Sequence, residues 1–131
     1  LIGKINKCKN IKWDNRFFDN SEIDSIFESV SLVLIMYKHI SQSGVISDAC
    51  NHSTPVIAFD IDGIREFVNE NTACLVNAFD IKEYAYGIVE LLNNKETWRK
   101  MCKDAYEMGE KMYSAQGMAN GFAEFYIDLL K

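Results

Sequence analysis

Apolar residues gather in short unbroken runs along this chain, and between the runs they recur at helical spacing. Residues 31–37 (SLVLIMY) are continuously apolar, which is typical of a strand buried on both faces of a parallel sheet. Residues 55–59 (PVIAF) predict a second buried strand, in which Pro55 takes the first position, where no ladder hydrogen bond is lost. Residues 73–76 predict a third strand, and residues 11–14, where apolar and polar positions alternate, predict another.

Helices are expected between and after these strands. Asn20 and Ser21 supply caps ahead of an apolar stripe that ends at Val30. Further helices are expected over residues 44–50, 64–69, 80–92, 98–108 and 117–129. The last helix is expected to turn Met118, Phe122, Phe125, Tyr126 and Leu129 inward. The short apolar pattern of residues 1–4 predicts the end of a strand. Strands that alternate with helices indicate the α/β class with a parallel sheet.

Composition and charge narrow the class of protein. The chain has 131 residues, 48% of them hydrophobic and 25% charged, which suits one globular domain with a substantial core. Its net charge of −5 and the lack of a basic cluster argue against nucleic acid as the main partner. The longest apolar run is too short to cross a bilayer, and the chain opens without a secretory signal. The first residue is Leu1 rather than Met, so we expect the chain to begin inside a longer protein.

The cysteines are expected to be packing residues. Cys8, Cys50, Cys74 and Cys102 form no CxxC pair, and the chain has only two histidines, so a zinc site is not indicated. Three of the four lie within apolar patterns, where a thiol behaves as a small core residue. Reduced thiols indicate a cytoplasmic protein.

Two loops follow the first two buried strands, and ligands bind at the carboxyl ends of parallel strands. Residues 38–44 (KHISQSG) lead to Gly44 at a helix N-terminus, where free N–H groups and the helix dipole favour an anion such as a diphosphate. Asp48 lies one turn further on, where its carboxylate could accept hydrogen bonds from ribose hydroxyls. The alternative is an ordinary strand-to-helix turn with Asp48 solvated. His39 lies in the same loop, whereas His52 is expected to end the helix.

The second loop carries Asp60 and Asp62, two carboxylates that could hold Mg²⁺. The alternative, which we favour, is a turn in which Asp60 caps the next helix and Asp62 and Gly63 supply the turn geometry.

Taken together, residues 11–92 resemble the donor-binding half of a group 1 retaining glycosyltransferase with the GT-B fold. The resemblance rests on a buried strand, a small polar loop (SQSGV), a short helix with an acidic residue, and a second buried strand (TPVIA, residues 54–58). After that strand the family pattern continues through Asp60, Gly63, Glu66 and Val68 in order. The pattern covers about two thirds of the chain.

The resemblance implies roles for particular residues. The backbone of Ser43, Gly44 and Val45 would meet the diphosphate of a nucleotide sugar, Asp48 would bind ribose, and the loop with Arg16 and Phe17 would border the base. The implied donor-binding residues are Ser41, Gln42, Ser43, Gly44, Val45 and Asp48. Two departures from the pattern are Ile40, near which the family has a glutamate that contacts the donor sugar, and Asp62, where the family often has glycine.

The resemblance also implies an activity for the longer protein. Residues 1–131 would form one Rossmann-like nucleotide-sugar-binding domain, incomplete at its start, with residues 114–131 as a C-terminal helix. The enzyme would be a hexosyltransferase of polysaccharide biosynthesis that moves a sugar from a nucleoside diphosphate to a saccharide or lipid-linked acceptor, with retention and without a metal cofactor. An N-terminal acceptor domain would be its partner, so this chain alone would be inactive, and its catalytic residues are unknown. Peripheral association of the full enzyme with the inner face of the membrane stays open.

Two other functions fit parts of the sequence. Residues 56–63 (VIAFDIDG) look like the nucleophile motif of haloacid-dehalogenase-type phosphatases, in which Asp60 would attack phosphorus, Asp62 would act as general acid and Mg²⁺ would bind nearby. That motif normally continues with Thr, whereas this chain has Ile64. A non-catalytic nucleotide-binding module is the other alternative.

Overall fold

The computed structural model describes residues 8–131, and its centre is a parallel three-stranded sheet. The strands are β1 (Val33–Ile35), β2 (Val56–Asp60) and β3 (Ala73–Asn77), in the order β1-β2-β3. Val56 pairs with Val33 on one side and with Ala73 on the other. All three strands run the same way, so the loops that follow them meet at one edge. The α/β class is confirmed. The strand end predicted at residues 1–4 lies outside the described residues.

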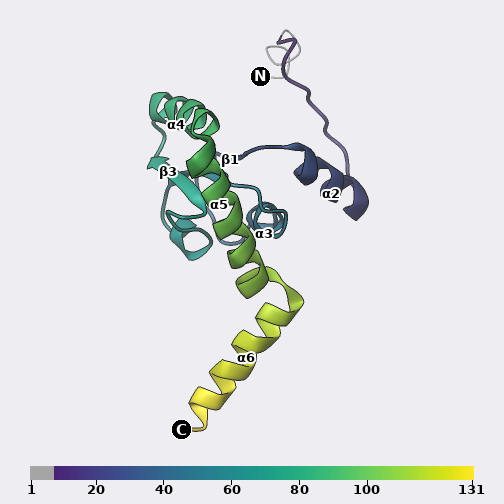
Figure 1. The fold of residues 1–131 in the computed structure, drawn as a ribbon, viewed down its shortest axis with the longest axis vertical. Coiled ribbons are helices and arrows are strands. Elements are labelled where there is room, and N and C mark those ends of the chain that lie inside the picture. Colours follow the sequence, from purple (N-terminus) through teal and green to yellow (C-terminus); the bar gives the residue numbers. More distant parts are fainter. Residues whose placement is uncertain (1–7) are drawn as a thin grey trace.

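Helices cover the sheet and continue beyond it (Figure 1). They are α2 (Asn20–Ser29), α3 (Gly44–Asn51), the 3₁₀ turn η1 (Ile64–Glu66), α4 (Ile81–Asn93), α5 (Lys95–Met108), the π-helical η2 (Gly109–Tyr113) and α6 (Ala115–Leu129). Polar side chains cap several of them: Ser43 caps α3 and Asp80 caps α4. Asp19, one residue before the expected cap, starts α2 in a full capping box with Glu22.

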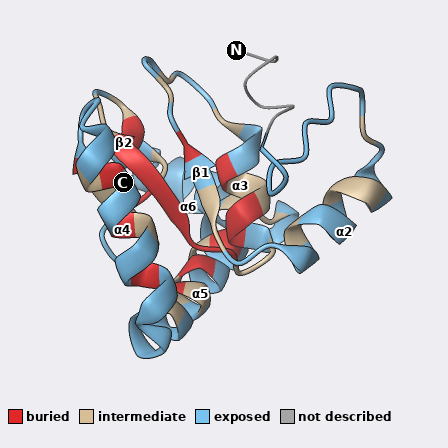
Figure 2. Cartoon of the chain, turned by 90° about the horizontal axis from the view of Figure 1, so that it is seen from above, coloured by how far each residue is buried: buried red, intermediate tan, exposed pale blue. Residues whose placement is uncertain are grey.

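The core lies on both faces of β2, which Figure 2 shows buried along its length. Val56 and Ala58 pack with α3, η1 and Ile35 on one face, while Ile57 and Phe59 pack with Val76 and Tyr84 on the other. The hydroxyl of Tyr84 donates a 2.8 Å hydrogen bond to the carbonyl of Ile57, which anchors α4 to the strand.

The cysteines within apolar patterns behave as expected. Cys50 is buried and Cys74 and Cys102 are half-buried. Burial raises the pKa of the Cys50 thiol to about 11. Burial therefore favours the protonated thiol, as expected of a packing residue.

Residues 31–37 do not form the strand, buried on both faces, that the sequence predicts. Only Val33–Ile35 form a strand, and Leu34 and Met36 are 46% and 57% exposed. Within residues 8–131, β1 pairs with β2 alone, so it is an edge strand and one of its faces lacks cover. An apolar run cannot by itself distinguish a central strand from such an edge.

Three other predictions are wrong. Residues 11–14 form no strand and are exposed, since no neighbouring strand pairs with them in the described part of the chain. The helix predicted at residues 64–69 is only the 3₁₀ turn η1. The expected inward face of the last helix is also wrong: α6 packs chiefly against η2 and projects from the body, and each of its five predicted inward residues is at least half exposed (Figure 1).

None of the helices described between residues 8 and 131 is both long enough and apolar enough to cross a membrane.

Gly117 sets how α6 leaves η2, because a Cβ at this position would collide with the carbonyl oxygens of Glu110 and Lys111. We expect Gly117→Ala to lower the free energy of unfolding by about 1–3 kcal/mol, the usual cost of overpacking. Gly121 lies on the same helix in open space. Gly121→Ala should therefore raise helix stability by about 1 kcal/mol. Urea unfolding followed by circular dichroism measures both changes, and equal effects of the two variants would contradict the close contact at Gly117.

Candidate functional site

The loop after β1 delivers the N-terminus of α3 to the carboxyl edge of the sheet. Ser43 is the cap residue, and its Oγ accepts a hydrogen bond of 3.3 Å from the backbone N–H of Ile46. The hydroxyls of Ser43 and Tyr37 lie 3.4 Å apart, so the cap is tied back to the segment that leaves the strand. Ahead of Ile46, the N–H groups of Gly44 and Val45 are the first of the helix and have no intrahelical acceptor, and such groups favour an anion.

The backbone at this helix tip is accessible. Gly44 is exposed, and a Cβ placed on it would meet nothing within 4 Å. Val45 is exposed as well, and Ser41 and Gln42 ahead of the cap are exposed. The predicted diphosphate-binding residues are therefore contiguous at the tip of α3, and all of them are exposed except the half-buried cap, Ser43.

Asp48 lies one turn into α3 and is half-buried. The backbone carbonyl of Asp48 accepts a hydrogen bond of 3.0 Å from the backbone N–H of His52. The Nδ1 atom of the His52 ring lies 2.8 Å from the same carbonyl oxygen. No hydrogen bond to the Asp48 carboxylate is present among residues 8–131. The carboxylate is therefore available to a ligand.

His52 ends α3, as predicted, and also joins it to α2. Its Nε2 lies 3.1 Å from Oδ1 of Asp24, and its ring stacks on Phe27 with centroids 5.3 Å apart. Because Asp24 and Phe27 lie far from His52 along the chain, no local sequence pattern predicts this contact. His39 is exposed in the loop after β1.

The loop after β2 is built as a turn. Arg65 donates two hydrogen bonds to Asp60, one from Nε at 3.0 Å and one from NH2 at 2.8 Å. Both oxygens of Asp60 are thereby engaged, which disfavours a metal ligand or a phosphoryl nucleophile, and Gly63 has the positive φ that a turn requires. The expected helix cap is wrong: η1 begins after Gly63 without a side-chain cap, because Asp60 pairs with Arg65 instead. Asp62 is exposed, and residues 8–131 contain no group of three or more side chains placed to hold a metal ion.

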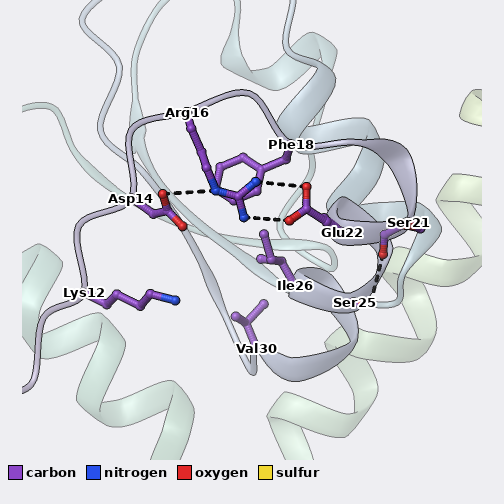
Figure 3. A pocket seen from close by; sticks show the side chains of 9 residues that line it. All are labelled: Lys12, Asp14, Arg16, Phe18, Ser21, Glu22, Ser25, Ile26 and Val30. Carbon is purple, nitrogen blue, oxygen red and sulfur yellow. Dashed lines mark hydrogen bonds and ion pairs between the residues drawn. The ribbon is translucent and has the colours of Figure 1, made fainter.

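Arg16 lies in a separate hollow of about 660 Å³ between the N-terminal segment and α2 (Figure 3). Its guanidinium binds both carboxylate oxygens of Glu22 at 2.6 and 3.0 Å, contacts Asp14 at 3.4 Å and covers the ring of Phe18 at 4.4 Å. These hydrogen bonds hold the pKa of Glu22 below its ordinary value. Phe17 is fully exposed. The lining of the hollow includes none of residues 41–48, so the structure does not join the two predicted groups in one cavity.

Comparison with known proteins identifies the family. The model of the group 1 glycosyl transferases matches residues 4–94, which is more than half of the chain. The chain belongs to the group 1 glycosyltransferases. The solved structure of sucrose-phosphate synthase from Thermosynechococcus elongatus matches with a TM-score of 0.79 at 18% identity. That match covers 98% of this chain and 32% of the synthase chain, so the present chain spans about a third of the synthase. The structural match shows that this chain has the fold of part of a GT-B enzyme. No curated protein matches the sequence.

Sequence reasoning missed one feature of this glycosyltransferase domain at the same edge. Phe79, after β3, has a φ of +64°, which is rare for a bulky residue, and its ring lies 5.5 Å from that of Phe59. No local pattern indicates such a conformation. The pairing of Asp60 with Arg65 was also missed, although two opposite charges five positions apart across a predicted turn could have suggested it.

Proposed function

We propose that this chain is the donor-binding part of a retaining hexosyltransferase that uses a nucleoside-diphosphate sugar. The accessible tip of α3 carries the proposal, since the N–H groups of Gly44 and Val45, at the carboxyl edge of a parallel sheet, donate to no acceptor within residues 8–131. Family membership supports the nucleotide sugar as the ligand class. In this proposal residues 1–131 serve as one nucleotide-sugar-binding domain with residues 114–131 as its C-terminal helix.

The helix tip would act on the leaving group. As the bond between sugar and diphosphate breaks, negative charge grows on the diphosphate. Fixed N–H dipoles and the positive end of α3 would stabilise that charge without reorganising. The same fixed dipoles take the part that a metal ion plays in other transferases. Ser41, Gln42 and Ser43 would line the diphosphate, and Asp48 would accept hydrogen bonds from the ribose hydroxyls.

The remaining parts of the reaction belong to a longer enzyme. The acceptor, a saccharide or a lipid-linked saccharide, would bind to a second domain that faces the tip of α3. Arg16 and Phe17 would border the base after Arg16 exchanges its contact with Glu22 for one with the ligand. Such an enzyme would serve polysaccharide biosynthesis in the cytoplasm, at or near the membrane that carries a lipid-linked acceptor.

Removal of the Asp48 carboxylate tests the ribose contact. Asp48→Ala should weaken binding of the preferred nucleoside diphosphate by about 10- to 100-fold, because a hydrogen bond to a charged group contributes about 1.5–3 kcal/mol. Calorimetric titration with UDP, GDP, ADP and CMP identifies the preferred nucleotide and gives both dissociation constants. Asp104→Ala is the matched control, because Asp104 is a half-buried carboxylate on α5. Equal affinity of Asp48→Ala and the parent chain would remove Asp48 from the site.

A side chain at Gly44 tests the phosphate contact. Gly44→Val leaves the fold intact, since its Cβ meets no protein atom within 4 Å, but it places a branched side chain where the diphosphate would approach. We expect at least a tenfold loss of nucleoside diphosphate affinity, about 1.4 kcal/mol, by the same titration. Gly121→Val is the control, because Gly121 is equally open and lies on α6. Full binding by Gly44→Val would contradict the proposed role of the α3 tip.

A further inference from the structure

The loop that precedes α3 rests on the turn that follows β2. Gly63 has a φ of +84°, and a Cβ on it would lie 3.3 Å from the backbone oxygen of Ile40 and 3.5 Å from Ile40 Cγ2. Ile40 is immediately followed by Ser41, the first of the proposed diphosphate-binding residues. The turn at residues 60–65, which we name the supporting turn, therefore lies directly against the loop that carries those residues.

The supporting turn is closed by an ion pair. Arg65 binds both oxygens of Asp60 at 2.8 and 3.0 Å, across the residues that include Gly63. Bidentate geometry fixes the relative orientation of the two groups more firmly than a single contact does. Within the turn, the N–H of Ile64 donates to the carbonyl of Ile61 at 3.1 Å, and the buried side chain of Ile64 holds the turn to the core.

Arg65 is unsuited to bind the diphosphate itself. Its NH1 also lies 3.4 Å from Oε1 of Glu70, so one guanidinium faces two carboxylates. The hydrogen bond to Asp60 raises the pKa of Arg65 above its ordinary value. The three charges sum to −1, and a diphosphate would be repelled by this group. Arg65 can therefore act on the site only through the turn that it closes.

We propose that the Asp60–Arg65 pair, through Gly63 and Ile40, positions residues 41–44 for the donor diphosphate. The inference rests on the proposed function, since it assigns positioning residues for that site. A loop held in its binding conformation loses less conformational entropy when the ligand binds, so opening the pair should cost affinity without touching the ligand.

The experiment measures loop order and binding in the same variants. Asp60→Asn and Arg65→Gln each remove the charged pair from a partly exposed position. Lys103→Gln is the control, because it removes the exposed Lys103–Glu107 pair on α5. The backbone ¹⁵N order parameters of residues 38–44 should fall from about 0.85 toward 0.6 in the two test variants, while those of residues 73–92 and the melting temperature stay as in the parent chain.

The same variants are then titrated with UDP, GDP, ADP and CMP. We expect Asp60→Asn and Arg65→Gln to bind the preferred nucleotide about 3- to 10-fold more weakly than the parent chain and the control variant do. The reason is that the loop is then only partly held in its binding conformation before the nucleotide binds. If the parent chain binds, then unchanged order parameters of residues 38–44 or unchanged affinity in the two test variants overturns the positioning role and leaves the proposed function standing. Failure of the parent chain to bind any of the four nucleotides contradicts the proposed function itself.

Discussion

The parallel pairing of β2 with strands on both sides is the constraint on which the candidate site depends. Val56 is paired with β1 and β3 at once, and β2 is buried on both faces, so its position in the sheet is fixed by hydrogen bonds and packing together. Parallel pairing brings the ends of β1 and β2 to one edge, and the chain must leave both strands there. The loop that leads to α3 and the supporting turn are neighbours for this reason.

This arrangement separates the packed face of α3 from its accessible tip. Ile46, Ala49 and Cys50 hold α3 to the sheet through one face, while Gly44 and Val45 at its tip stay exposed. A ligand at the tip therefore meets a helix dipole that packing has already oriented. Asp48 belongs to the same helix, so its distance from the tip is set by the helix geometry and does not depend on loop motion.

Local chemistry could be read from the sequence, whereas contacts between distant segments could not. The apolar runs at residues 55–59 and 73–76, and the helical patterns over residues 44–50 and 80–92, predict β2, β3, α3 and α4 because each signal lies within a few residues. The exposed face of β1 and the projecting α6 depend on what other segments cover them, and an apolar pattern carries no such information. Residues 41–45 and Asp48 follow one predicted strand and open one predicted helix, so the local pattern and the resemblance both predict them on one loop and one helix tip. The contact of Gly63 with Ile40 and the joining of α2 to α3 by His52 required the structure.

The most direct test is to map the nucleotide on the chain by nuclear magnetic resonance. Amide shifts of a ¹⁵N-labelled sample are followed during titration with the preferred nucleoside diphosphate. Binding at the tip of α3 predicts that the largest shifts belong to residues 41–48, with Gly44 and Val45 foremost, because their N–H groups would donate directly to phosphate oxygens. Shifts confined to residues 12–30, around the hollow that Arg16 lines, would contradict the placement of the diphosphate at α3.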